Sequence, residues 1–296
     1  MIGVEWGTTS FRAFRLTAEG AIRDRRHGPR GVLNVQDGRF GDTLREEVGP
    51  WLAAGERHIL LCGPVGGPRG WVEAPLLPCP AGPAELARAL GRVPFDWAEV
   101  RQMPGLTCSD AGGVLGVIRC EAALVVGALA QFGGAGLACV PGSNSTWARV
   151  EAGRIVGFAT HATGETFVAL RGQVFPGRTI RDAPASDLAA FDAGVARSGQ
   201  EGGLLHHLFG MRALALAERF ADGAAGSFLW GLLIGHEVRA ALAGLPPGAV
   251  VHVIGAPELT SSYARAIEAA GGLAERLNGE AIARGLALIG AAARWE

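Results

Sequence analysis

The feature that most constrains this chain is a strand–turn–strand pattern that occurs once in each half. Residues 1–16 are predicted to form an apolar strand, a tight turn and a returning strand, and residues 137–150 repeat that order. Third strands are expected near Ile22 and Ile155, each after an acidic residue and a glycine. Because the second pattern begins about half a chain after the first, we expect a duplicated domain. The alternative is coincidence between two short patterns.

The two turns have the composition of phosphate-binding loops that lack a Walker motif. Glycine lets the backbone approach an anion, successive N–H groups form a concave nest, and hydroxyl groups donate hydrogen bonds. The candidate nucleotide-binding residues are Gly7, Thr8, Thr9, Ser10, Gly142, Ser143, Asn144 and Ser145. Glu5 lies at the mouth of the first turn, where a carboxylate could hold Mg²⁺. Ordinary hairpin turns share this composition, so the hypothesis depends on the pairing of the two copies.

Composition excludes several functional classes. The chain has 296 residues, 49% of them hydrophobic and 19% charged, which is enough for a large core and two domains. It contains no lysine, which rules out a Walker-A loop, a Schiff-base lysine and a protein-kinase lysine. The formal net charge of −1 gives no reason to expect binding to nucleic acid or to an anionic membrane surface.

The cysteine pattern indicates reduced thiols, and the opening segment and the apolar runs give no reason to expect export or membrane insertion. Five cysteines are scattered without a CxxC pair, so neither a zinc site nor a disulfide framework is expected. The sequence opens on a predicted strand without the basic and apolar segments of a signal peptide. No uninterrupted apolar run reaches the roughly 18–20 residues that a membrane span needs. We therefore expect a cytoplasmic protein.

In the first half, the loop over residues 63–70 is the next candidate site. A helix is predicted over 40–54, with a break or kink at Pro50, and a strand over 58–62 leads into this loop. Ligands in α/β folds usually bind at the ends of strands, although a plain flexible connection has the same composition. A helix over 118–132 carries Glu121 in its first turn.

In the second half, the strand over 250–254 ends at Gly255, a common place for an adenine and also a common end of an α/β strand. Helices are expected over 203–220, 228–242, 261–270 and 279–293, with a helix or turns over 185–199. The glycine-rich stretch 133–136 is the expected domain boundary, which gives domains 1–132 and 133–296.

Several long segments give the chain a resemblance to a known family. They are GWVEAPLLPCPA (70–81), RCEAALVVGALAQ (119–131), PGSNSTW (141–147), TGETFVALR (163–171), LLHHLFGMRALALA (204–217), FLWGLLIGHEVR (228–239) and VIGAPEL (253–259). With the opening strand and turn, they resemble the 2-dehydro-3-deoxygalactonokinases. These enzymes belong to the actin-like ATPase superfamily, which also contains other sugar kinases.

The resemblance implies an α/β fold of two RNase-H-like domains with a cleft between them. ATP and Mg²⁺ would be held by both hairpins, and a small sugar acid, a 2-keto-3-deoxy acid, would be phosphorylated at its terminal hydroxyl on the N-terminal domain. A homodimer is compatible with this expectation. Glu121 is the candidate base, Glu5 the metal ligand, and Gly255 marks the nucleotide side. The implied substrate-binding residues are Gly67, Arg69, Trp71 and Arg119.

The sequence departs from the family pattern in the motifs that carry chemistry. Glu5 stands where the family has Asp, and the loop before Trp71 lacks a Ser and an Arg for which Arg69 could substitute by a register shift. The helix after Arg119 begins with fewer polar residues, and the second hairpin has Asn144 and Thr146 in place of His and Lys. The lost lysine removes a positive charge near the phosphates.

These departures leave several alternatives open. Glu121 is either a base or a carboxylate that favours its helix N-terminus, and Glu165 either faces the nucleotide or helps Thr163 to cap a helix. Arg12 and Arg149 are candidate cations or solvated strand residues. The chain is accordingly expected to be an active kinase, a kinase with a changed acceptor, or a catalytically weakened paralogue that binds nucleotide or metabolite as a sensor or subunit.

Overall fold

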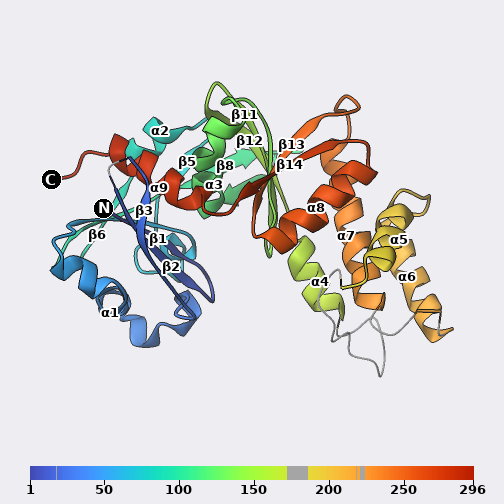
Figure 1. Ribbon diagram of the computed structural model, residues 1–296, viewed down its shortest axis with the longest axis horizontal. Helices are drawn as coiled ribbons and strands as arrows, with labels where there is room; N and C mark the ends of the chain where they lie inside the picture. The colour runs from blue at the N-terminus through green and yellow to red at the C-terminus, as the bar shows by residue number, and fades with distance from the viewer. Residues whose placement is uncertain (18, 172–185, 218, 221–223) are drawn as a thin grey trace. The chain divides into compact units, whose positions relative to one another are not determined.

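The computed structural model describes residues 1–17, 19–171, 186–217, 219–220 and 224–296 (Figure 1). The chain divides into two compact units, and each combines sheets with helices. Unit 1 comprises residues 1–136, 148–159 and 279–296, and unit 2 comprises residues 137–147 and 160–278.

The main sheet of unit 1 has six strands in the order β3-β2-β1-β4-β7-β6. The first hairpin supplies its antiparallel pair β1–β2, β3 pairs antiparallel with β2, and β4 lies parallel to β1 on the other side. The strands are β1 (Ile2–Trp6), β2 (Phe11–Leu16), β3 (Ile22–Gly28), β4 (His58–Cys62), β6 (Gly91–Val93) and β7 (Glu99–Gln102). Every residue of β1 except Glu5, and every residue of β2 except Arg12 and Arg15, is buried, and the apolar residues at these positions predicted the hairpin correctly.

The remaining elements of unit 1 cover this sheet and add a small second one. The helices are α1 (Phe40–Ala53), α2 (Pro83–Arg88), α3 (Cys120–Ala128) and α9 (Ala281–Ala292). A three-stranded sheet contains β5 (Leu76–Pro78), β8 (Gly105–Ser109) and β9 (Leu115–Ile118). Short 3₁₀ turns are η1 (Val32–Asn34), η2 (Gln36–Gly38), η3 (Pro64–Gly66) and η4 (Leu129–Gln131). Helix α1 continues through Pro50, where a break or kink was expected, because this exposed residue lies in the last turn and few hydrogen bonds depend on it.

The division into units differs from the expected domains 1–132 and 133–296, because helix α9 belongs to unit 1. Its backbone packs directly on α3. A β-carbon at Gly127 would lie 1.8 Å from the carbonyl oxygen of Ala281, and one at Gly285 would lie 1.9 Å from that of Ala123. Only glycine permits two helices to approach this closely, so these two residues fix the last helix of the chain in unit 1.

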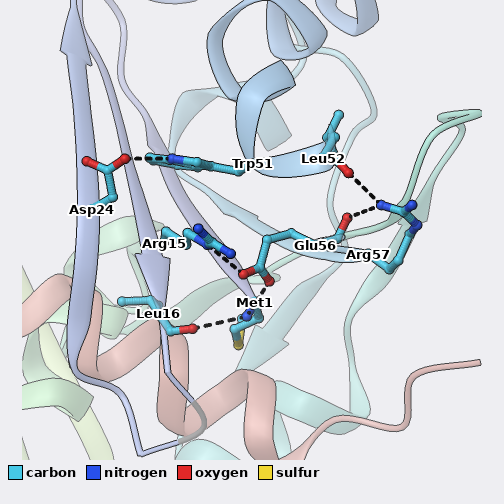
Figure 2. Close-up of polar contacts among 8 residues, drawn as sticks. All are labelled: Met1, Arg15, Leu16, Asp24, Trp51, Leu52, Glu56 and Arg57. Carbon is cyan, nitrogen blue, oxygen red and sulfur yellow. Dashed lines mark hydrogen bonds and ion pairs between the residues drawn. The ribbon is translucent and has the colours of Figure 1, made fainter. Parts of the chain in front are cut away.

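Polar contacts near the chain start join β2 and β3 to α1 and the segment after it (Figure 2). Glu56 accepts a hydrogen bond from Arg15 at 2.8 Å and pairs with the amino group of Met1 at 3.0 Å. Burial works to raise the pKa of Glu56, but these two partners outweigh it, so the pKa is lowered. The indole N–H of Trp51 donates to Asp24 at 2.8 Å.

The second sheet repeats the topology of the first. Its order is β12-β11-β10-β13-β14, so a hairpin again carries a third strand on one side and a parallel strand, β13, on the other. The strands are β10 (Gly136–Val140), β11 (Ser145–Glu151), β12 (Arg154–His161), β13 (Val250–Gly255) and β14 (Leu273–Asn278). This shared order is what a duplicated domain predicts.

The described residues of unit 2 form the helices α4 (Thr163–Arg171), α5 (Leu188–Ser198), α6 (Gly203–Leu216), α7 (Ala224–Leu242) and α8 (Pro257–Ala269). Helices α5 and α7 also touch through glycines, since a β-carbon at Gly194 or Gly231 would lie 2.1 or 2.0 Å from a backbone oxygen of the other helix. Residues 185 and 218, which fall in the helical stretches expected over 185–199 and 203–220, lie outside the described residues. Of the helices that the structure describes, none has the length and apolar character of a membrane span.

Candidate functional site

The first turn is closed by its own backbone and supported from one side. The N–H of Gly7 donates to the carbonyl of Ser10 at 2.9 Å. The segment after β3 holds the turn, because Val32 and Leu33 donate to the carbonyls of Gly7 and Thr8 at 2.9 and 3.0 Å. Thr8 and Thr9 remain exposed, so their hydroxyl groups are accessible to a ligand.

Glu5, the candidate metal ligand, forms an ion pair with Arg12. The two residues face each other across the β1–β2 ladder, and the side chain of Glu5 is only 15% exposed. Burial raises the pKa of Glu5, Arg12 acts to lower it, and the nearby charge of Glu121 raises it further. Arg12 therefore belongs to this cluster and is not simply a solvated strand residue.

Glu121, the candidate base, lies at the start of α3 and has two relationships. Its Oε2 accepts the backbone N–H of Arg119 at 2.8 Å, so it does satisfy the N-terminus of its own helix. Its charge also acts on the pKa of Glu5. Glu5 pairs with Arg12, and Glu121 lies within electrostatic range of Glu5. We refer to these three residues, from three elements of unit 1, as a cluster, to which Glu121 belongs although it also satisfies its own helix.

Two thiols adjoin the same carboxylates. Burial raises the pKa of Cys62, at the end of β4, and of Cys120, at the start of α3, and the charges of Glu5 and Glu121 add to both shifts. Thiols with raised pKa values are poor nucleophiles at neutral pH. We assign them a packing role beside the acidic pair.

The loop over residues 63–70 is held in one shape by its glycines and by Arg119. Gly63 has φ of 104°, and a β-carbon there would lie 2.7 Å from the carbonyl oxygen of Trp6. Arg119 Nη1 donates to the carbonyl of Gly66 at 2.9 Å, and its guanidinium adjoins Gly67. Arg119 therefore uses one of its N–H donors to hold the loop. A guanidinium has several N–H donors, so others could bind a ligand.

The other two expected substrate residues differ in their surroundings. Arg69 is exposed at the end of the loop. The ring of Trp71 stacks on Phe40 at a centroid distance of 6.2 Å and meets Trp6 and Phe95 edge-on at 6.5 and 6.1 Å. Packing therefore accounts for much of the Trp71 surface.

The second turn is held by the first residues of α4. The N–H of Glu165 donates to the carbonyl of Ser143 at 2.9 Å, and the amide of Asn144 donates to the Glu165 carboxylate at 3.0 Å. A β-carbon at Gly164 would lie 2.7 Å from the carbonyl oxygen of Gly142. Glu165 thus contacts the hairpin itself, an interaction that neither of its two expected roles included.

Ser145 and Thr146 point away from solvent, with side chains 0% and 1% exposed. The Ser145 hydroxyl donates to the buried carboxylate of Glu237 on α7, so Ser145, expected to bind the nucleotide, is enclosed and does not face a ligand. Glu237 was not among the candidate site residues that the sequence indicated. The signal that could have identified it is a carboxylate in the otherwise apolar run FLWGLLIGHEV.

Gly255 ends β13, and α8, which follows it in the chain, lines a cavity of which Gly255 is not a lining residue. This cavity has a volume of about 560 Å³, and its polar lining includes Glu258, Ser261, Arg265 and Arg276. Arg276 donates to the hydroxyl of Ser261 at 2.6 Å. Arg149, by contrast, is 67% exposed and pairs with the exposed Glu151 at 3.5 Å, as expected of a solvated strand residue.

Comparison with known proteins identifies the family to which the chain is similar. The model of the 2-keto-3-deoxy-galactonokinase family matches residues 5–289. The probable 2-dehydro-3-deoxygalactonokinase of Rhizobium meliloti (strain 1021) is 32% identical over 90% of this chain and 89% of its own length.

Two solved structures extend the comparison. The crystal structure of a proposed 2-dehydro-3-deoxygalactonokinase from Sinorhizobium meliloti is 30% identical, with a TM-score of 0.86 over 97% of both chains. The activator of a 2-hydroxyisocaproyl-CoA dehydratase from Clostridium difficile was solved with bound ADPNP. Its alignment spans 97% of this chain and 92% of its own length. Its TM-score is 0.52 at 11% identity, a likeness of fold alone. The fold is that of the actin-like ATPases and sugar kinases, as expected.

Proposed function

We propose that this chain, which belongs to the 2-keto-3-deoxy-galactonokinase family, transfers the γ-phosphoryl group of ATP to the terminal hydroxyl of a 2-keto-3-deoxy sugar acid. The family match establishes membership of a family of keto-deoxy sugar-acid kinases. The hydroxyl that is phosphorylated, the residue roles and the retention of activity are our proposals.

The observation that carries the proposal is the cluster of Glu5, Arg12 and Glu121. Phosphoryl transfer needs an acceptor for the hydroxyl proton, cations for the charge on the phosphates, and positioning. We assign proton acceptance to Glu121 Oε1, because Oε2 already bonds the Arg119 N–H. Arg12, which adjoins Glu5, supplies a positive charge in a chain whose second hairpin has lost its lysine.

The donors around Glu5 fit magnesium. Among the residues that the structure describes, no three His, Cys, Asp or Glu side chains form a metal-binding group. Magnesium on a nucleotide needs fewer, since one or two carboxylates, water and the phosphates usually complete its shell. Glu5 would be the protein ligand, with Glu121 nearby. Bound there, the ion would neutralise charge on the phosphates.

The substrates occupy different parts of the chain in this proposal. We assign the phosphates to the turns 7–10 and 142–145 and the adenosine to the neighbourhood of Gly255 and the cavity on α8. We assign the acid to the loop over 63–70, where Arg69 and the free donors of Arg119 would bind its carboxylate. This assignment follows from the exposure of Arg69 and from the contact of Arg119 with Gly66.

A coupled assay for ADP formation tests the proposal. The acceptors are 2-keto-3-deoxy-galactonate, its C4 epimer and a set of unrelated sugar acids, each with MgATP and with EDTA. We expect Mg²⁺-dependent turnover with at least one keto-deoxy acid. Preference for another acid would support a changed acceptor. If MgATP raises the melting temperature while no acceptor is phosphorylated, the chain is a nucleotide-binding subunit.

Glu121→Gln tests the role of the base. Because Gln retains an oxygen for the Arg119 N–H, the helix should remain capped while kcat falls by roughly 10²-fold or more. Glu85→Gln is a matched control, since Glu85 accepts the N–H of Gly82 at 3.0 Å at the start of α2. Equal activity of the two variants would show that Glu121 acts only on its helix.

A further inference from the structure

Glu237 is a carboxylate in the core of unit 2. Its side chain lies on α7 and the residue is 4% exposed, with Gly235 and Val238 buried beside it in the sequence. A charged group buried in this way is costly unless hydrogen bonds compensate it. Its partners therefore indicate why α7 carries an acid at this position.

Three side chains from two other elements direct hydrogen bonds at this carboxylate. Ser145 Oγ and Trp147 Nε1, both on β11, lie 2.6 and 2.7 Å from Oε1. The hydroxyl of Tyr263 on α8 lies 2.8 Å from Oε2. An indole N–H can only donate, so this arrangement suits an acceptor that carries negative charge. Burial and the charge of Glu237 both raise the pKa of Tyr263, which keeps its hydroxyl protonated as a donor.

The contact with Ser145 fixes one end of the second turn. Ser145 follows Asn144 directly, and the other anchor of the turn comes from α4, through Ser143, Asn144 and Glu165. Ser143 and Asn144 themselves are exposed. The exposed tip of this turn is thus held between α4 on one side and, through Ser145, the carboxylate of α7 on the other.

We propose that Glu237 is a positioning residue for the nucleotide. By holding Ser145, it sets the direction of the N–H groups at residues 142–144, which would receive the phosphates of ATP. This inference rests on the proposed function. Glu237 touches no substrate in this account, because its carboxylate is enclosed by Ser145, Trp147 and Tyr263.

Two substitutions separate positioning from simple stabilisation. Ser145→Ala removes the bond that reaches the turn and leaves Glu237 two donors. Tyr263→Phe removes one equally buried hydroxyl from the same carboxylate, but on α8 and away from the turn. Both variants lose one hydrogen bond to the carboxylate, so both should lower the melting temperature.

The measurements are titration calorimetry with MgADP and, for turnover, the KM values of ATP and of the acid. For Ser145→Ala we expect the Kd of MgADP and the KM of ATP to rise about tenfold, with the KM of the acid unchanged. For Tyr263→Phe, the Kd of MgADP and the KM values of ATP and of the acid should all stay within about twofold of wild type. Glu237→Ala, which leaves no acceptor for the Ser145 hydroxyl, should show the same nucleotide-specific loss if it folds, and Ser145→Ala keeps the test decisive if it does not.

The outcomes are distinct. If wild type binds MgADP but phosphorylates no acid, the kinase proposal fails while the calorimetric comparison still decides the role of Glu237. If Ser145→Ala and Tyr263→Phe change nucleotide affinity equally, or if neither changes it, Glu237 only stabilises the fold and the inference is overturned. If wild type binds no nucleotide, both proposals fail.

Discussion

At the scale of single residues, the sequence singled out Glu5 and Glu121 as candidates but did not predict their connections. Glu5 and Glu121 were identifiable because each stands at the end of a predicted element. The ion pair of Glu5 with Arg12 depends on β1–β2 register, and the contact of Asn144 with Glu165 joins residues 21 positions apart. Local patterns do not encode such pairings, so Arg12 and Glu165 were left with open alternatives.

The raised pKa of Glu5 predicts a pH-dependent stability. A carboxyl whose pKa is raised by burial holds its proton more tightly in the folded chain, so folding is disfavoured as pH rises above the ordinary value of about 4.5. Glu5→Gln removes this effect. Between pH 4 and pH 7, the free energy of unfolding of the variant should therefore increase relative to that of wild type by about 1 kcal/mol.

Urea unfolding at four pH values measures this difference. Glu151→Gln serves as the control, since Glu151 is 66% exposed and pairs with Arg149 at the surface. That variant should follow the wild-type curve. If Glu5→Gln also runs parallel to wild type, burial of Glu5 does not influence folding.

At the scale of elements, periodicity found the long helices and the buried strands, while the small sheet of unit 1 was missed. No strand was expected where β8 and β9 lie, and β9 ends at Ile118, where a helix was expected to begin. For β9, part of the reason is Gly116, because a glycine inside a strand weakens the strand pattern of the sequence. In the structure a β-carbon there would lie 3.1 Å from the ring of Phe158. Gly116 thus leaves room for a side chain distant in the sequence.

Helix packing predicts opposite effects for two glycine-to-alanine substitutions. Gly285→Ala places a methyl group 1.9 Å from the carbonyl of Ala123 and must separate α9 from α3, at a cost of about 1–3 kcal/mol or more. Gly210→Ala lies on α6, where the nearest atom is 4.0 Å away. It should stabilise by about 0.5–1 kcal/mol. Thermal unfolding checks both, and a neutral Gly285→Ala would show that the two helices separate at little cost.

At the scale of the whole molecule, the resemblance and the repeated hairpin predicted the fold correctly. The repeated strand order of the two sheets follows the expected duplication. The division of the chain is different, since residues 148–159 and 279–296 join unit 1. A boundary read from the glycine-rich stretch 133–136 could not show this, because the return of α9 depends on contact between two helices that are far apart in sequence.

This division predicts the behaviour of a nicked chain. A protease site inserted between Gly133 and Gly134, followed by cleavage, should give two fragments that co-elute in native size-exclusion chromatography. They should stay together because the second fragment contributes α9 to unit 1. They should separate in denaturant. Fragments that separate under native conditions would instead support independent domains 1–132 and 133–296.

The close helix contacts also limit which mutations the gene can accept at four glycines, Gly127, Gly194, Gly231 and Gly285. Every single-base change in a glycine codon that alters the amino acid introduces a β-carbon or ends the chain. At these positions that carbon would fall within 2.1 Å of a backbone oxygen, whichever residue replaces the glycine. No single-base change at these codons therefore gives a residue that fits between the helices. Among related sequences, these four glycines should be replaced less often than the surface residues around them, and the spacing of α3 from α9 and of α5 from α7 should be retained.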